Sequence, residues 1–350
     1  MTAPETVVQQ VAISLTHPAR MRARASAHGL GGVELGPFRY LELHCGRGSN
    51  LLPLAARFPE ASFVGAEPNG QQLAEAKVAA EACGISNVEL IEAEALPLDG
   101  PLDGLLDGSA PFDYVVAHGI YSWVPEAEQR ALLDTCGQAL APTGVACVSY
   151  NCMPGWSIRG VVRDLMLGAA RGRGGQERLR AGRSLVTKLQ RHLDGDHPYR
   201  ALLAAELSLV HDKSDAELLD DHLADCNEPL YLADFVTRAS KHGLTYLSEL
   251  IPATPDGAME LEVPAQLMAQ GLSRVEAEQC LDALCYRQLR ATLLCREGAD
   301  VREQVDHVFL AGAGYFAGRL VPGTEEPLLG PGKMLRFQTP TGVVIEADRP

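Results

Sequence analysis

Short hydrophobic runs alternate with helix-like stretches over roughly the first 150 positions. Five apolar runs have the length and flanking turn residues of strands: 40–43, 61–66, 88–92, 112–117 and 145–150. Three alanine- and leucine-rich stretches between them predict helices: 50–58, 70–82 and 125–140. Continuously apolar runs such as YVVA are typical of parallel strands that are buried on both faces. The pattern therefore predicts a doubly wound α/β sheet of the Rossmann type.

After Pro154 the pattern changes character. It is helical from Asp215 to about Cys295, and a short hairpin is predicted between Met334 and Ala347. The predicted organisation has four parts: an N-terminal helical cap at 1–35, a ligand-binding α/β domain at 36–156, a mainly helical domain at 157–310, and a loop with a short hairpin at 311–350.

The segment from Arg159 to Arg191 is basic in an otherwise acidic chain. It holds nine Arg or Lys residues and only two acids. Two interpretations are open: a docking face for an acidic partner, or a solvated helix face that balances the acidic stretch from Asp212 to Glu228. The second interpretation is favoured.

Composition excludes several classes of function. The 350 residues carry 45 acids against 30 bases, a formal net charge of -15, which argues against a nucleic-acid binder. No apolar stretch reaches the ~18 residues that span a bilayer, and the N-terminus lacks a secretory signal, so a cytoplasmic protein is expected. Nine cysteines without a CxxC pair predict neither a disulfide framework nor a zinc ribbon. His222 and His242 are too isolated to predict a metal site.

The first strand ends in a glycine turn that opens a helix, as in nucleotide-binding domains. Gly46 and Gly48 are followed by Ser49-Asn50-Leu51, so the third glycine of the NAD fingerprint is missing. An acid, Glu42, lies inside the strand instead. S-adenosylmethionine has a cationic amino group and a sulfonium but no phosphates, and an acid suits those charges better than a diphosphate. The turn therefore favours S-adenosylmethionine over NAD as the ligand.

Candidate chemistry lies where further strands end, because ligands of such sheets bind at the carboxyl edge. Glu67 ends the second strand and is expected to hold ribose hydroxyls, and Glu94 follows the third. His118 and Tyr121 follow the fourth strand and are candidate bases or proton relays. The fifth strand ends in Tyr150 and Asn151, candidate hydrogen-bond partners for an amine.

Two aromatic side chains accompany these strand ends. Trp123 and Trp156, the only tryptophans, could attract a cationic substrate through their ring faces. Packing at a helix entry is an equally weighted alternative for each. For His118 the alternative to proton transfer is orientation of the adenine or of a backbone carbonyl.

The chain resembles bacterial class I methyltransferases that carry a methyltransferase regulatory domain, a family that includes rickettsial outer-membrane-protein lysine methyltransferases. LELHCGRGSNLLPLA, FVGAEPNGQQLAEA, FDYVVAHGIYSWVP, VSYNCMPGW and THPAR carry the resemblance in the first half. HLADCNEPLYLADFVTRASKHGLTYLSEL and RQLRATLLCRE are similar to the regulatory domain. The resemblance implies a seven-stranded sheet and the cofactor S-adenosyl-L-methionine. It also implies a regulatory segment that caps the donor pocket, shapes the acceptor site or forms a homodimer interface.

The strand-end residues and the resemblance together predict two groups of site residues. Those expected around the donor are Glu42, His44, Cys45, Gly46, Gly48, Asn50, Glu67, Pro68, Gln72, Glu94, Ala95, His118 and Gly119. Those expected around the acceptor are His17, Arg20, Trp123 and Trp156, with His118, Tyr121, Tyr150 and Asn151 as catalytic candidates.

The chain departs from the family pattern in three ways. His44 stands where relatives have the first loop glycine, which puts loop geometry or donor affinity in question. Glu67 and Glu94 are one methylene longer than the usual Asp. Many relatives continue into a further C-terminal domain, whereas this sequence stops at Pro350.

Three functional hypotheses remain open at this level. The leading one is methyl transfer from S-adenosylmethionine by in-line displacement to an amine, either a protein lysine or a small molecule. The second is S- or O-methylation of a small metabolite. The third is a catalytically silent subunit that binds the donor only.

Overall fold

The computed structural model describes residues 13–31, 36–92, 111–193, 197–253, 258–303, 319–320, 335–338 and 344–347. Its main feature is one seven-stranded sheet with the strand order β3-β2-β1-β4-β5-β7-β6. Five strands come from the first half of the chain: β1 Arg39–Leu43, β2 Ser62–Glu67, β3 Val88–Glu92, β4 Phe112–Ala117 and β5 Leu140–Asn151. These five are parallel to one another. The doubly wound α/β prediction is confirmed.

The last two strands of the sheet come from a region that we predicted to be helical throughout. β6 spans Leu244–Glu249 and β7 spans Leu289–Arg296. β7 lies antiparallel to both β5 and β6. The prediction of unbroken helix between Asp215 and Cys295 is therefore wrong. Both strands are short and almost wholly buried, with polar residues among the apolar ones, and such a segment has no period that separates strand from buried helix.

Helices cover both faces of the sheet and give it two hydrophobic cores. The helices and 3-10 turns of this layer are η1 Ser14–Thr16, α1 Pro18–Ala27, α2 Leu51–Arg57, α3 Gly70–Ala82, η2 Tyr121–Trp123, α5 Glu126–Ala139 and α10 Leu232–Ser240. One core contains buried residues of α5 and α10, and the other contains buried residues of α1 and α2. Each fully buried Leu or Phe in them contributes about 1.5–3 kcal/mol relative to an exposed one.

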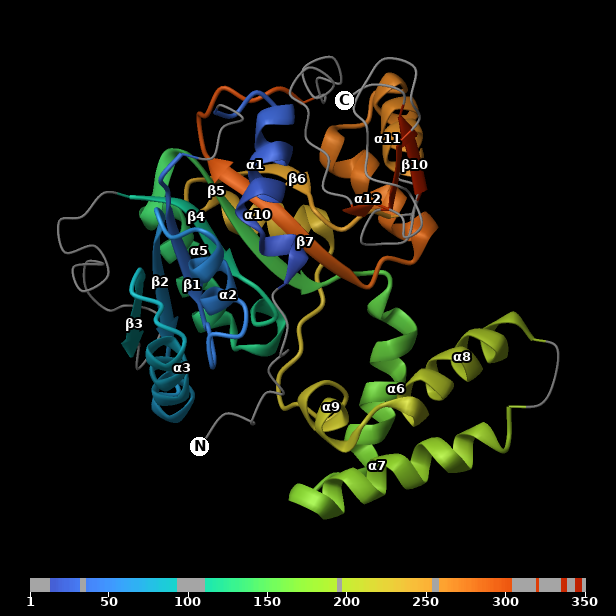
Figure 1. Ribbon diagram of the computed structural model, residues 1–350. Coiled ribbons are helices and arrows are strands. Elements are labelled where there is room, and N and C mark those ends of the chain that lie inside the picture. The colour runs from blue at the N-terminus through green and yellow to red at the C-terminus, as the bar shows by residue number, and fades with distance from the viewer. Residues whose placement is uncertain are drawn as a thin grey trace.

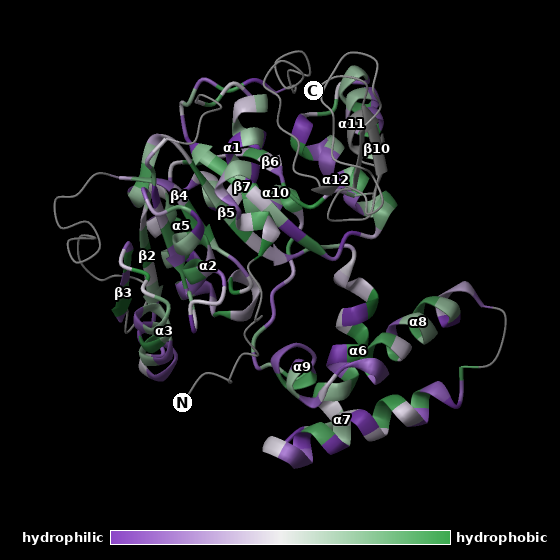
Figure 2. Ribbon diagram, in the orientation of Figure 1, coloured by the Kyte–Doolittle hydropathy of each residue, from purple (hydrophilic) through white to green (hydrophobic). Residues whose placement is uncertain are grey.

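Four further helices form a separate group beside the carboxyl edge of the sheet (Figure 1). They are α6 Trp156–Ala169, α7 Gly175–Gln190, α8 Pro198–Asp212 and α9 Asp215–Asp220. Polar and apolar residues alternate along α7 and α8 (Figure 2), and their apolar faces share a third core with α6 and α9. We call α6 to α9 the helical unit.

Two arginines of the basic segment form ion pairs with acids of the stretch from Asp212 to Glu228. Arg178 lies 2.9 Å from Asp225, and Arg183 lies 2.7 Å from Asp215. Both acids belong to the acidic stretch, so the favoured interpretation of internal charge balance is confirmed for these pairs.

The remaining elements lie toward the C-terminus. They are α11 Ala258–Ala269, α12 Arg274–Cys285, and the short strands β8 Arg319–Leu320, β9 Leu335–Gln338 and β10 Val344–Ala347. β9 and β10 pair in antiparallel fashion, as the predicted hairpin requires. No helix among the described residues is both long and apolar enough to cross a membrane.

Candidate functional site

The glycine loop connects the end of β1 to the start of α2. Gly46 and Gly48 have φ angles of 55° and 75°, in the left-handed region that glycine tolerates. His44 has a φ of 57° and enters the same region with a side chain, which costs roughly 1–2 kcal/mol. The loop therefore has the left-handed backbone at the position where relatives have glycine, and the departure at His44 is accommodated as backbone strain.

Glu67 connects the end of β2 to this loop. Its Oε2 accepts a hydrogen bond from the Gly46 N–H at 2.8 Å, and its Oε1 accepts one from the Asn69 N–H at 2.9 Å. Burial raises the pKa of Glu67 above its usual value, and the two backbone hydrogen bonds oppose that shift. The carboxylate is thus fixed where a ligand at the glycine loop would meet it.

Glu42 is buried in β1 and connects the loop to the N-terminal segment. Its Oε2 accepts from the Asn50 amide at 3.0 Å, and the Asn50 Oδ1 accepts from the Ile13 N–H at 2.8 Å and the Thr16 hydroxyl at 3.0 Å. Burial raises the pKa of Glu42 to about 8. A cationic ligand would stabilise the anion that burial disfavours, so the Glu42 carboxyl suits an amine or a sulfonium and would oppose a phosphate.

The other predicted donor residues vary in placement. Cys45 is buried, and burial raises the pKa of its thiol. Gln72 is buried in the first turn of α3, which Asn69 caps by accepting from the Gln71 and Gln72 N–H groups. Pro68 is exposed. Glu94 and Ala95 lie outside the described residues.

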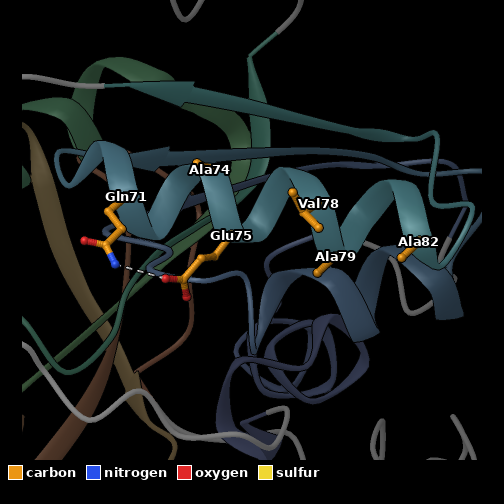
Figure 3. A pocket seen from close by; sticks show the side chains of 6 residues that line it. All are labelled: Gln71, Ala74, Glu75, Val78, Ala79 and Ala82. Carbon is orange, nitrogen blue, oxygen red and sulfur yellow. Dashed lines mark hydrogen bonds between the residues drawn. The ribbon is translucent and has the colours of Figure 1, made fainter.

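A shallow groove runs along the outer face of α3 and is distinct from this pocket (Figure 3). Its walls are Gln71, Ala74, Glu75, Val78, Ala79 and Ala82. Gln71 donates to Glu75 at 3.4 Å, and Glu75 pairs with Arg47 at 2.6 Å. The groove is a stripe of small side chains on an exposed helix and contains none of the predicted site residues, so we do not assign the donor to it.

His118 and Gly119 lie at the carboxyl end of β4, as predicted. Burial lowers the pKa of His118 to about 4, so the ring is neutral at neutral pH. Its Nδ1 is buried and has no hydrogen-bond partner among the described residues. The Gly119 N–H donates to the Ser149 hydroxyl at 2.7 Å, and a Cβ at Gly119 would meet nothing within 4 Å. This strand end therefore offers a neutral ring beside open space.

Asn151 ends β5, the neighbouring strand. Its N–H donates to the Ser122 hydroxyl at 2.9 Å, and its side-chain amide donates to the Asn227 Oδ1 at 2.8 Å. Asn227 belongs to the NEPLY segment of the regulatory half. The structure thus joins two polar side chains that are far apart in the sequence.

The aromatic candidates are mostly packing residues here. Tyr121 and Tyr150 are buried in the core, where Tyr150 stacks on Phe235 with ring centroids 4.1 Å apart. Trp156 is buried and meets the half-buried Trp123 edge-on at 5.9 Å. These contacts give Tyr121, Tyr150 and Trp156 no direct access to an acceptor, while Trp123 remains a candidate.

His17 and Arg20 do not join the other candidates. The His17 Nδ1 caps α1 by accepting from the Ala19 N–H at 3.2 Å, and its ring packs against Phe58, which follows the far end of α2. Arg20 donates to the Leu250 carbonyl at 2.5 Å. These contacts hold α1 on the sheet and give no support to the predicted substrate role.

The sheet order, with its antiparallel seventh strand, and the acid-glycine-acid pocket define a class I methyltransferase domain. A family model described as a methyltransferase domain matches residues 41–146. A second, described as a predicted methyltransferase regulatory domain, matches residues 214–296. Residues 41–146 therefore form a methyltransferase domain and residues 214–296 a methyltransferase regulatory domain, and the resemblance and the expected cofactor, S-adenosylmethionine, are confirmed.

Related proteins agree with this assignment. An uncharacterized protein of Rickettsia prowazekii is 31% identical over 297 residues, which cover 84% of this chain and 52% of that protein. A second from the same organism is 29% identical over 230 residues, 65% of this chain and 89% of that protein. The solved structure of PKMT2 from Rickettsia typhi in complex with AdoHcy has a TM-score of 0.76 and 27% identity, and the match covers 97% of this chain and 65% of that one. The chain thus spans about half of the first relative's length.

Three contact residues were missed at the level of sequence: Ser122, Ser149 and Asn227. Ser122 and Ser149 stand inside the strand-end segments that drew attention to His118 and Asn151. Asn227 stands in NEPLY, a block that supported the family resemblance but carried no predicted role. Its proximity to β5 arises from tertiary structure alone.

Proposed function

We propose that this protein is an S-adenosylmethionine-dependent methyltransferase that acts on an amine. The observation that carries the proposal is the placement of the Glu42 and Glu67 carboxyls beside the left-handed glycine loop, which suits a cationic adenosyl ligand. PKMT2 from Rickettsia typhi, whose structure is known with AdoHcy, supports the same donor class. The acceptor is proposed to be a protein lysine or a small-molecule amine.

Residues at the ends of β1 and β2 would bind the methyl donor, and residues at the ends of β4 and β5 would bind the acceptor. Glu42 and the glycine loop would hold the methionine end of the donor, and Glu67 would hold the ribose. S-adenosylmethionine supplies an electrophilic methyl group on a sulfonium. An amine acceptor would form the N–C bond as the C–S bond breaks, with the electron pair leaving on sulfur, so alignment provides most of the catalysis.

His118 would take up the proton that the methylated amine releases. Its low pKa makes it a weak base, but it is unprotonated at neutral pH and ready to accept a hydrogen bond. A relay to solvent through His118 would suffice because the proton leaves after the positive charge has developed on nitrogen. Asn151 would orient the amine.

Calorimetric titration with S-adenosylmethionine, S-adenosylhomocysteine and NAD tests the donor site. Micromolar binding of both adenosyl ligands without NAD binding is the expected result. Transfer of radiolabelled methyl from S-adenosylmethionine to poly-L-lysine and to n-butylamine then tests the acceptor class. Binding without transfer to either amine would favour S- or O-methylation or a silent subunit, and failure of both adenosyl ligands to bind would refute the proposal.

A further inference from the structure

The segment from Asn227 to Leu230, which we call the NEPL segment, lies along the carboxyl ends of β4 and β5. Its backbone is tied to both strand ends: the Glu228 N–H donates to the Ser122 carbonyl at 2.9 Å, and the Leu230 N–H donates to the Asn151 carbonyl at 3.0 Å. The Leu230 carbonyl accepts from the Met153 N–H at 2.9 Å. The regulatory half therefore contributes a wall to the edge of the sheet where the acceptor is proposed to bind.

A second anchor fixes the other side of this segment. Arg238 of α10 donates to the Glu228 Oε1 at 2.6 Å and to the Gln129 Oε1 at 2.8 Å. The ion pair connects the NEPL segment to α10 and α5. Among the described residues, neither Arg238 nor Glu228 forms a side-chain hydrogen bond with Asn151, so this anchor holds the segment without bonding to the amide itself.

The Asn227 side chain contacts Asn151 directly. The Asn151 Nδ2 donates to the Asn227 Oδ1 at 2.8 Å. This bond occupies the nitrogen end of the Asn151 amide and leaves its Oδ1 as the end without a hydrogen bond among the described residues. An oxygen acceptor in that position is complementary to an amine N–H.

We propose that Asn227 is a positioning residue for the methyl acceptor: it holds the Asn151 amide so that its Oδ1 accepts an N–H of the incoming amine. This inference rests on the proposed function and deepens it. When one N–H is held by Asn151, the rotation of the amine is restricted and its lone pair can be aligned for in-line attack. The regulatory half would then contribute to acceptor binding through a single side chain.

The substitutions must distinguish an effect on the orientation of the Asn151 amide from a general loosening of the NEPL segment. An aspartate at 227 can only accept, so Asn227→Asp keeps the Asn151 Nδ2 bond and the Oδ1 orientation. Asn227→Ala removes the bond and lets the Asn151 amide rotate. Glu228→Gln is the matched control, because it weakens the Arg238 anchor of the same segment and leaves the Asn151–Asn227 contact in place.

The test is titration of Nα-acetyl-lysine methylamide into each variant saturated with S-adenosylhomocysteine. We expect amine binding to weaken at least about tenfold in Asn227→Ala, a loss typical of one hydrogen bond to a charged or polar partner, and to stay within about threefold in Asn227→Asp and Glu228→Gln. Affinity for S-adenosylhomocysteine should be the same in all four proteins.

Three outcomes would overturn the inference. One is equal amine affinity in Asn227→Ala and the unaltered protein. Another is a loss in Glu228→Gln as large as in Asn227→Ala, which would indicate general loosening of the segment. The third is absence of amine binding to the unaltered protein with S-adenosylhomocysteine bound. Failure of S-adenosylhomocysteine itself to bind would instead refute the proposed function, so the two failures are distinguishable.

Discussion

The carboxyl edge of the sheet has a donor half, at the ends of β1 and β2, and a proposed acceptor half, at the ends of β4 and β5. The contacts that build the two halves differ greatly in sequence separation. In the donor half, Glu67 and Gly46 are 21 positions apart, and Asn50 and Glu42 are 8 apart. In the acceptor half, Asn151 and Asn227 are 76 positions apart and belong to different halves of the chain. A local motif can therefore specify the donor site, whereas the proposed acceptor site needs a contact between the two halves of the chain.

The sheet shows the same dependence on the second half of the chain. β6 and β7 complete it, and β7 pairs directly with β5, the strand that ends in Asn151. The sequence boundary at 156 therefore does not separate two independent folding units. Substitutions that destabilise the regulatory half should therefore also disturb the proposed acceptor half, because β7 pairs with β5.

The largest expected effect comes from breaking the buried ion pairs that join β7 to β6 and α12. Arg290 is fully buried, and its guanidinium donates to Asp282 of α12 at 2.7 and 2.8 Å and to Glu249 of β6 at 3.1 Å. Arg290→Met would leave buried carboxylates without this partner, and should lower the free energy of unfolding by about 3–5 kcal/mol. Urea denaturation, followed by circular dichroism, measures the loss.

Arg130→Ala is the matched control for Arg290→Met. Arg130 forms an exposed pair with Glu126, one helical turn earlier, and its removal should change stability by no more than about 0.5 kcal/mol. Similar losses in both variants would contradict the view that the buried ion pairs of Arg290 hold β6, β7 and α12 together.

The difference in contact range also explains what could be predicted from sequence. The first five strands, α3 and the glycine loop follow from local apolar spacing and from turn residues such as Gly46 and Gly48. β6 and β7 could not be predicted in this way, because a short and almost wholly buried segment has no period that separates strand from helix. Likewise, Tyr150 stands at a strand end and was predicted to be catalytic for that reason. Its stacking on Phe235, which only the structure reveals, places it in the hydrophobic core.

Glu67→Ala should have the next largest effect, confined to the donor half. It removes the acceptor of the Gly46 and Asn69 N–H groups and the proposed partner of the ribose. Donor affinity should fall about 10- to 100-fold, the range expected for loss of charged hydrogen bonds, as measured by calorimetry with S-adenosylhomocysteine.

Glu60→Ala, an exposed acid in the turn that precedes β2, removes the same charge and should leave donor affinity unchanged. If the amine affinity of Glu67→Ala fell as much as its donor affinity, the two halves would not be separable in the way proposed here.

The pH dependence of donor binding sharpens the assignment of Glu42. Burial raises the pKa of this carboxyl from 4.5 to about 8, so below pH 8 the protein without ligand holds a proton there. Binding a cationic amino group requires that proton to leave, so affinity should rise about tenfold from pH 6 to pH 7 and level off above pH 8. The stability of the ligand-free protein changes in the opposite direction, because an acid with a raised folded pKa destabilises the fold progressively as pH rises from 4.5 to 8.

Glu42→Gln separates this titration from others in the pocket. In that variant, affinity for S-adenosylhomocysteine should be weaker and flat between pH 6 and pH 8. A slope that persists would assign the titration to another group, such as Glu67, whose pKa burial also raises.

The smallest expected effect concerns the strained loop residue. His44 occupies the left-handed region with φ 57°, and glycine there would remove a cost of roughly 1–2 kcal/mol while adding about 0.5–1 kcal/mol of chain entropy to be lost on folding. His44→Gly should therefore stabilise the protein by no more than about 1.5 kcal/mol, measured by urea denaturation beside the unaltered chain, and leave donor affinity within about threefold. A large loss of donor affinity would mean that the imidazole itself contacts the donor. A large gain would mean that strain at His44 holds the loop away from its binding geometry, and the silent-subunit hypothesis would then gain a physical basis.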